Sequence, residues 1–394
     1  MGKWIIPIGL LALAIAHGLI EQLDTPVLTA EPAENRSRAA WVDRQWSVRV
    51  DKLAPTTERL KLNIAGMERL QAHKQRASTL DDGTLVWQGA LSGNGVPPAA
   101  GTSKAATNTI LLISNDRGMT GTLRWEGHVY RLYHRGRQTV LEEVNPSKLP
   151  PDHEPTDALG ASACPPQGTT GGLQPGVTTI RVLVVAGKKA AAAHEDIEAL
   201  AQLAIEEGNQ TLDLSAIGLS FQLAGFELLD YVESGQGNSL EMLRLWRKDD
   251  GHMDEVHPRR DALAADAVVQ LVDTTHPDSC GVAAGMTEDK AFAVVNMACI
   301  GVSRYTFAHE IGHIIGAAHD GGGGPFAYGH GYAHEPAESS KLYTVMAAGR
   351  PGIVRLPYWS DPQREVDGIR LGDKETADNR RLLEERKGIV AGFR

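Results

Sequence analysis

The sequence predicts an α/β (α+β) fold, in which a mixed, mainly parallel, twisted sheet is preceded by a small β-rich region. From about residue 177 onward, apolar runs of strand length alternate with segments of helical spacing, which is typical of a sheet whose strands are joined through helices. Between residues 84 and 134, apolar and polar residues alternate between glycine turns, which is typical of antiparallel strands. A chain of 394 residues is long enough for both parts to have a core.

Residues 1–16 have the features of a signal peptide. Lys3 precedes an apolar stretch from Trp4 to Ala16, which ends in the small-x-small pattern Ala14-Ile15-Ala16. The stretch is short for a bilayer, although apolar residues resume at Leu19, so an uncleaved N-terminal anchor is the alternative. We expect export to the extracellular space or the periplasm, cleavage of the signal, and no stable membrane insertion afterwards.

Residues 17–145 make up the predicted N-terminal region. From 17 to 80 the sequence is polar, with leucines scattered among many charges, and it indicates loosely helical, partly ordered chain. Strands are expected within residues 84–134, at 84–91, 108–116 and 120–134. The last of them includes a hairpin turn at Glu126-Gly127.

Residues 146–176 are predicted to be an exposed linker. This segment contains prolines at 146, 150, 151, 155, 165, 166 and 175, together with five glycines. Such a composition does not build a core. Because proteolytic nicking concentrates in exposed linkers, we expect a processing cleavage here.

The C-terminal region, residues 177–394, carries the predicted sheet. Thr179–Val185 is a largely apolar run suited to a buried strand, and apolar residues recur at helical spacing over His194–Gln210. The further elements expected are strands at Leu219–Phe226, Ala267–Val272 and Ala291–Asn296, a polar helix near 238–248, and a closing helix at Asp378–Arg394. The sequence leaves open whether Ala291–Asn296 is an edge strand or an interior strand.

Charge and cysteine content narrow the class of protein. A net charge of −10 without a long basic run argues against nucleic acid as a partner. Cys280 and Cys299 flank an apolar stretch, and in an exported protein we expect them to form a disulfide, which leaves Cys164 over.

The segment His309–Asp320, with the sequence HEIGHIIGAAHD, is the strongest functional signal. On a helix, His309 and His313 are one turn apart and face the same way, so both imidazoles can reach one metal ion. Glu310 lies beside them and can contact a water molecule at the metal without being a ligand. A continuous helix would turn His319 away, but Gly316 can adopt the left-handed conformation that ends helices, after which the chain can deliver His319. Three histidines with one open position are typical of a catalytic zinc.

This segment resembles the extended HExxHxxGxxHD motif of the metzincin metalloproteases, and Asp320 after the third histidine is similar to the adamalysin or reprolysin branch. Residues 343–347, with the sequence YTVMA, resemble the Met-turn, whose methionine would be Met346. Three more segments resemble the bacterial reprolysin-like group: Tyr328–Tyr332, Tyr358–Pro362 and Ala377–Asn379. The resemblance covers roughly residues 176–394.

The resemblance implies a zinc endopeptidase with a metzincin-type fold, which has an active-site helix and a C-terminal helix. His309, His313 and His319 would hold one zinc ion, with water as the fourth ligand, because Ala348 stands where some metzincins have a further tyrosine ligand. Glu310 would be the general base. Asp320 would fix local structure, for instance by bonding to the Met-turn, and a turn or helix-terminus aspartate is the alternative.

In that context residues 17–145 would be a propeptide rather than a separate binding domain. Cys164, in the linker, could occupy the fourth zinc position and keep the precursor latent. The prolines that follow it, Pro165-Pro166, differ from such switches in related families, so a free or otherwise paired cysteine stays an equal alternative. Calcium is not indicated, since no EF-hand pattern is present.

Two other functions are the alternatives: a secreted zinc-binding or adhesion module without catalysis, and a zinc hydrolase of a non-peptide substrate. Glu310 argues against the first, because a structural zinc site needs no base. Latency argues against the second, since it chiefly protects against damage to proteins. We expect a monomer that acts on protein or peptide substrates, with its specificity pocket lined by residues 350–358.

Overall fold

The computed structural model of the chain describes residues 25–33, 39–67, 69–136, 138–152, 176–273, 279–321, 323–336, 341–348, 350 and 353–394. The predicted signal peptide (1–16), Cys164 and most of the predicted linker lie outside the described residues. Among the helices described, none has both the length and the apolar character needed to cross a membrane.

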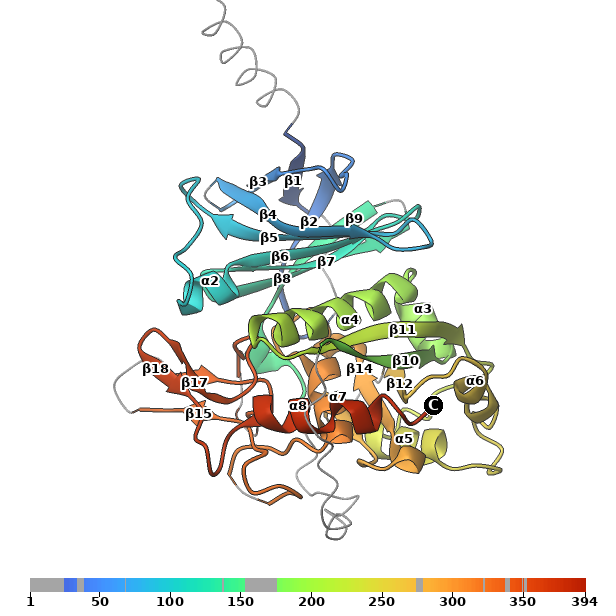
Figure 1. Cartoon of the computed structure of the whole chain (residues 1–394). Helices are drawn as coiled ribbons and strands as arrows, with labels where there is room; N and C mark the ends of the chain where they lie inside the picture. The colour runs from blue at the N-terminus through green and yellow to red at the C-terminus, as the bar shows by residue number, and fades with distance from the viewer. Residues whose placement is uncertain are drawn as a thin grey trace, which may run out of the picture.

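In the described part of the chain, strands β1 to β9 form a closed barrel, here called the N-terminal barrel (Figure 1). The strands are β1 (Val27–Pro32), β2 (Val42–Val50), β3 (Arg59–Ile64), β4 (Leu70–Thr79), β5 (Leu85–Ser92), β6 (Thr109–Ser114), β7 (Met119–Trp125), β8 (His128–Arg135) and β9 (Gln138–Val144), with a short helix α2 (Ser103–Thr107) after β5. The order around the barrel is β1-β2-β9-β8-β7-β6-β5-β4-β3, and a parallel pairing of β1 with β3 closes it. The barrel has its own apolar core.

The prediction for residues 17–80 was wrong, because β1 to β4 occupy most of residues 27–79. In β3, the leucines Leu60 and Leu62 and the residue Ile64 are buried, while the charged or polar residues between them face outward. This is the two-residue period of a half-buried strand. The period was obscured by the many charged residues on the outer face.

The predicted hairpin at Glu126-Gly127 is confirmed. These two residues join β7 to β8, with φ of 48° at Glu126 and 83° at Gly127. Positive φ at both central residues is the requirement of the type I′ turn, whose twist matches that of the flanking strands.

The C-terminal domain (residues 176–394) contains a five-stranded sheet in the order β11-β10-β12-β14-β13. Its strands are β10 (Thr178–Ala186), β11 (Leu219–Leu228), β12 (Ala267–Val272), β13 (Gly281–Ala283) and β14 (Phe292–Asn296). Four of them run parallel, and β13 pairs antiparallel with β14. Every residue of β12 and β14 is buried, as expected for central strands covered on both faces.

The open question about residues 291–296 is settled, because β14 lies in the interior of the sheet between β12 and β13. The edge strand on this side of the sheet is β13, which has only three residues. A strand this short has too few residues to show a periodic pattern, so it could not be predicted from the sequence.

Helices surround the sheet and connect its strands. The helices are α3 (Lys188–Ala193), α4 (Ile197–Leu214), α5 (Asn238–Trp246), α6 (Val256–Ala262), α7 (Thr306–Ile315) and α8 (Asn379–Val390), with 3₁₀ turns η1 (Pro146–Lys148), η2 (Glu288–Lys290) and η3 (Met297–Cys299). Two small hairpins complete the domain: β15 (Ala333–His334) with β16 (Leu342–Tyr343), and β17 (Asp361–Val366) with β18 (Ile369–Leu371). Helix α7 packs against α4, β13, β14 and α8, so it lies centrally in the domain.

The N-terminal barrel rests on α4, which lies between the barrel and the rest of the C-terminal domain (Figure 1). Val86, Leu111 and Ile113 of the barrel belong to the same apolar cluster as the C-terminal sheet and α4. The two parts of the chain therefore share a continuous core.

The prediction that residues 146–176 form an exposed linker is wrong for their first part. Residues 145–152, here called the connecting segment, leave the barrel through η1, and Leu149, Pro150 and Asp152 are buried. Proline content alone did not reveal this, because a segment without its own core can still be buried by another domain.

Candidate metal centre

Helix α7 carries the first two histidines of the candidate metal site. His309 and His313 lie one turn apart, and their ring centroids are 4.8 Å from each other. His309 is almost fully buried and His313 is half-buried. The helix therefore directs both imidazoles to the same place. The imidazole of His309 lies in the protein interior.

Gly316 ends α7 and redirects the chain, as the sequence predicts. Its φ is +116°, and its N–H donates to the carbonyl oxygens of Gly312 and His313. After this turn, Ala318 donates a backbone hydrogen bond to Gly329, so the chain runs back beside the histidines. The Nε2 atom of His319 then lies 3.1 Å from Nε2 of His309 and 2.9 Å from Nε2 of His313.

The arrangement of the three imidazoles fits a metal ion. Nδ1 of His309 lies 2.8 Å from the Val345 carbonyl oxygen, and Nδ1 of His313 lies 2.9 Å from that of Ala317. If these Nδ1 atoms carry the proton, each ring keeps the lone pair of its Nε2 atom for a metal. Within the described residues, His309, His313 and His319 form the one group of metal-ligating side chains close enough to share an ion.

Glu310 lies next to this group and is 1 % exposed. Burial raises the pKa of its carboxyl group well above the usual range, Arg355 opposes that rise, and the negative charge of Asp152 adds to it. The edge strand leaves room for the carboxylate, since a Cβ on Gly281 would lie 2.5 Å from Oε1 of Glu310. The side chain is thus held beside the histidines, where it can exchange a proton with a water molecule.

Met346 packs against helix α7, which carries His309 and His313. It is fully buried, and a Cβ on Gly312 would come within 2.9 Å of its sulfur atom. The preceding residue, Val345, supplies the carbonyl oxygen for His309. The segment that resembles a Met-turn therefore supports the histidines both by packing and by a hydrogen bond.

Asp320 bonds to the chain that follows this turn. Its Oδ1 accepts from the backbone N–H of Ala348 at 2.9 Å, and its Oδ2 pairs with Arg350 at 2.6 Å. These contacts match the structural role of Asp320 that the family resemblance implies. They also place Ala348, which has no ligand atom in its side chain, close to the histidine group.

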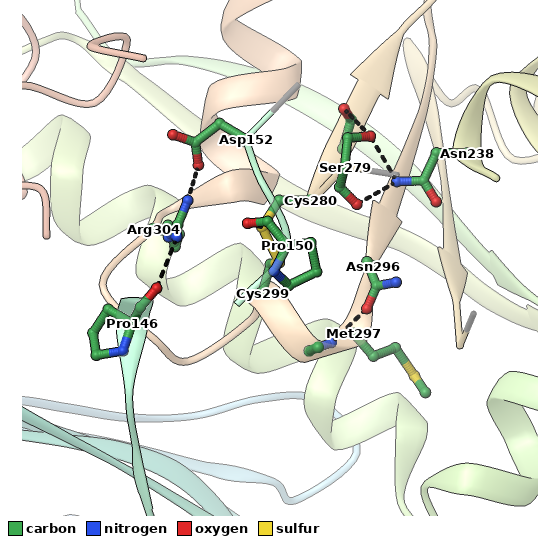
Figure 2. The surroundings of a disulfide bond; sticks show 12 residues. Pro146, Pro150, Asp152, Asn238, Ser279, Cys280, Asn296, Met297, Cys299 and Arg304 are labelled. Atoms are coloured by element: carbon green, nitrogen blue, oxygen red, sulfur yellow. Dashed lines mark hydrogen bonds and ion pairs between the residues drawn. A yellow bond between two sulfur atoms is a disulfide. The ribbon is translucent and has the colours of Figure 1, made fainter. Parts of the chain in front are cut away.

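The predicted disulfide between Cys280 and Cys299 is confirmed, and it joins the residue before β13 to the turn η3 before α7 (Figure 2). The Cα atoms of the two cysteines are 5.6 Å apart. The bond holds the edge strand next to the segment that leads into α7.

A buried group of charges near Glu310 was not predicted from the sequence. Asp152 of the connecting segment forms ion pairs with Arg304, which precedes α7, and with Arg355, which follows the Met-turn. Arg355 lies in the stretch 350–358 that was expected to line a specificity pocket. An arginine outside a known binding motif cannot be recognised as a site residue from a single sequence. These two arginines are identified only by their contacts with Asp152 in the folded protein.

Comparisons with known proteins agree with this geometry. A reprolysin model of metallopeptidase family M12 matches residues 177–353. A protein named peptidyl-Asp metalloendopeptidase from Stenotrophomonas maltophilia is 37% identical over 367 residues, which cover 88% of this chain and 86% of that protein. Proteins of the same name are found in Xanthomonas campestris, at 33% identity with 98% of both chains covered, and in Pseudomonas fragi. The last is 31% identical over 192 residues, which cover 48% of this chain and 100% of that protein.

Proposed function

The chain belongs to the reprolysin-like metallopeptidases of family M12 and is a metalloendopeptidase, and we propose that it is an exported zinc enzyme, made as a latent precursor, that cleaves peptide bonds next to aspartate. The observation that carries the proposal is the convergence of three imidazole Nε2 atoms beside the buried carboxylate of Glu310.

His309, His313 and His319 would hold the zinc ion through their Nε2 atoms. Zinc, when bound, lowers the pKa of a water molecule towards about 7 and polarises the carbonyl group of the scissile bond. The backbone carbonyl oxygens of Val345 and Ala317 orient the first two rings.

Glu310 would act as the general base. Its carboxylate accepts the proton of the attacking water and then passes it to the nitrogen of the leaving amine.

The edge strand β13 would bind the substrate backbone. Strand β13 is paired with β14 on one side only. Gly281, at the start of β13, is next to Glu310. An extended peptide that adds to such an edge gains main-chain hydrogen bonds and passes the catalytic carboxylate.

The proposed preference for aspartate rests on the names of the relatives. The proposed latency of the precursor rests on the position of the connecting segment. The relatives are named for peptidyl-Asp cleavage. The connecting segment is buried at the C-terminal domain, so it would have to leave before a substrate could take its place. Export follows from the predicted signal peptide and is consistent with the disulfide.

A peptide assay on the protein after its own processing tests this function. The substrates are two fluorogenic peptides that differ only at a central Asp or Asn. We expect hydrolysis of the Asp peptide that a chelator abolishes and that zinc restores.

Variants separate catalysis from metal binding. Glu310→Ala is expected to keep zinc and to lose at least ~10²-fold in kcat, whereas His313→Ala is expected to lose both zinc and activity. Zinc content is measured by elemental analysis of the purified proteins. Near-normal hydrolysis by Glu310→Ala would refute the mechanism.

A further inference from the structure

We propose that Arg304 and Arg355 form the pocket that recognises the substrate's aspartate, and that Asp152 of the connecting segment occupies this pocket in the precursor. The inference deepens the proposed function and rests on it. It assigns the specificity to two named residues and the latency to a third.

The guanidinium groups of Arg304 and Arg355 each contact one oxygen of the Asp152 carboxylate. Arg304 contacts Oδ1 of Asp152, and the NH2 group of Arg355 lies 3.0 Å from Oδ2 (Figure 2 shows the first pair). All three side chains are at least nine-tenths buried. The two positive charges compensate the negative charge of the buried carboxylate.

Backbone contacts hold the guanidinium group of Arg355 in place independently of Asp152, whereas that of Arg304 also donates to the Pro146 carbonyl oxygen of the connecting segment at 3.0 Å. Nε of Arg355 donates to the Ala347 carbonyl oxygen at 2.7 Å, and its NH1 group donates to that of Arg304 at 2.6 Å. Arg355 is thereby fixed to the residue after Met346. The pocket is part of the C-terminal domain, and the carboxylate is supplied by the N-terminal region.

The pocket adjoins the catalytic carboxylate. Arg304 is followed after one residue by α7, which carries Glu310. A Cβ on Gly281 would lie 2.5 Å from Oε1 of Glu310, and the preceding residue, Cys280, bonds to Pro151, the residue before Asp152. A side chain held where Asp152 lies is therefore close to the residue that would act on the substrate.

The backbone of the connecting segment also lies where an extended substrate would. The carbonyl oxygen of Pro151 accepts a 2.7 Å hydrogen bond from the N–H of Cys280, the residue directly before the edge strand β13. The carbonyl oxygen of Pro150 faces the sulfur of the same cysteine, at 3.6 Å (Figure 2). The segment thus combines a backbone contact at the sheet edge with a carboxylate in the arginine pocket.

Charge explains why such a pocket would select aspartate. When the connecting segment leaves, two buried guanidinium groups lose their counter-charge, which is unfavourable until another carboxylate enters. Asparagine has nearly the same shape but no charge, so it leaves the arginines unpaired. The positive charges of Arg304 and Arg355 would therefore bind Asp152 in the precursor and the aspartate of the substrate after processing.

The zinc-loaded full-length chain with Asp152→Asn tests the occupancy. We expect it to hydrolyse the Asp peptide at least ~10-fold faster than the full-length wild type, because the neutral amide binds the arginines weakly and yields to the substrate. Asp43→Asn is the matched control. It removes the ion pair of Asp43 with Lys148, which also anchors the connecting segment but involves neither Asp152 nor the two arginines, and its activity should match the wild type.

The double variants Asp152→Asn/Arg304→Gln and Asp152→Asn/Arg355→Gln test the pocket. Each removes opposite charges together, so neither leaves a buried carboxylate unpaired. We expect the ratio of kcat/KM for the Asp and Asn peptides to fall at least ~10-fold from its value in Asp152→Asn, because kcat/KM for the Asp peptide falls more than that for the Asn peptide. If both double variants kept the Asp preference, the pocket would be assigned wrongly.

A measurement on the wild type covers the case in which variants fail to fold. Peptides with the sequence of residues 146–152, ending in Asp or in Asn, are added to the processed wild-type protein. The Asp form should inhibit at least ~10-fold more strongly, and equal inhibition would overturn the inference. A processed wild type that cleaves neither fluorogenic peptide would instead count against the proposed function itself.

Discussion

His194 shows how a single side chain can couple the contact between the two parts of the chain to pH. Its ring packs against Tyr133 of the barrel, with centroids 5.6 Å apart, and both ring nitrogens are buried. Burial, assisted by the positive charges of Arg131 and Arg135 on the barrel and opposed by Asp196, lowers its pKa from 6.5 to about 4. The folded protein therefore keeps this imidazole neutral where the unfolded chain would already be protonated.

The sign of the resulting pH dependence follows. As pH falls from about 6.5 towards about 4, the unfolded chain gains a proton at His194 that the folded protein does not, so acid lowers stability. The slope from this residue is at most about 1.4 kcal/mol per pH unit. We expect His194→Gln to lose this contribution, as measured by urea unfolding of both proteins between pH 7.5 and 4.5. Identical pH dependence in the two would contradict the assignment.

Among elements, α7 shows how a helix terminus positions a ligand. Gly316 stops the helix in a left-handed conformation, and the guanidinium group of Arg386 on α8 donates to the carbonyl oxygen of Ile315 in the last turn. The terminal carbonyl groups of the helix are thus satisfied without further helical turns. The chain is then free to bring His319 to the other two histidines.

Gly316→Ala should disturb this terminus. Alanine would have to adopt the φ of +116° that glycine has at this position, and its Cβ would lie 3.0 Å from the Phe326 ring. We expect a loss of about 1–3 kcal/mol in the free energy of unfolding and a zinc affinity at least ~10-fold weaker, because His319 shifts. Zinc affinity is measured by competition with a chelator.

Gly368→Ala is the control for backbone strain alone. Gly368 has φ of +78° in the turn between β17 and β18, and a Cβ there would meet nothing within 4 Å. It should lose some stability but keep the zinc affinity. Equal zinc affinity in both variants would show that the end of α7 does not position His319.

For the whole molecule, the contact between the barrel and α4 depends on a buried ion pair. Arg124 of β7 pairs with Glu207 of α4, and its Nε donates to the Ser303 hydroxyl at 2.7 Å. Glu207 also accepts from the N–H of Gly301 at 2.9 Å, close to the segment that leads to Arg304. The barrel is thereby linked to the chain around the proposed site.

Arg124→Met should weaken this link strongly, because Glu207 is left buried without its partner. We expect a loss of about 3–5 kcal/mol in the free energy of unfolding, together with faster peptide hydrolysis by the full-length chain. Arg76→Met removes the exposed ion pair with Asp213 between the same two parts and should cost less than about 1 kcal/mol. Similar losses in the two variants would show that burial of the Arg124 pair is unimportant.

Features set by neighbouring residues were predictable from the sequence. The hairpin at Glu126-Gly127, the strand Ala267–Val272 and the turn at Gly316 depend on local backbone preference and on short periods. Where charged residues masked the period, as in β3, the prediction was wrong. The edge strand β13 was missed because three residues carry no period.

The histidine group follows from local sequence, because helical spacing and one glycine bring its three members together within 11 residues of chain, from His309 to His319. The closure of the barrel by β1 and β3, and the contacts of Asp152 with Arg304 and Arg355, are visible only in the folded protein. These contacts join positions far apart in the chain. Their partners are selected by the burial of charge and apolar surface in the folded molecule, and no local pattern records that choice.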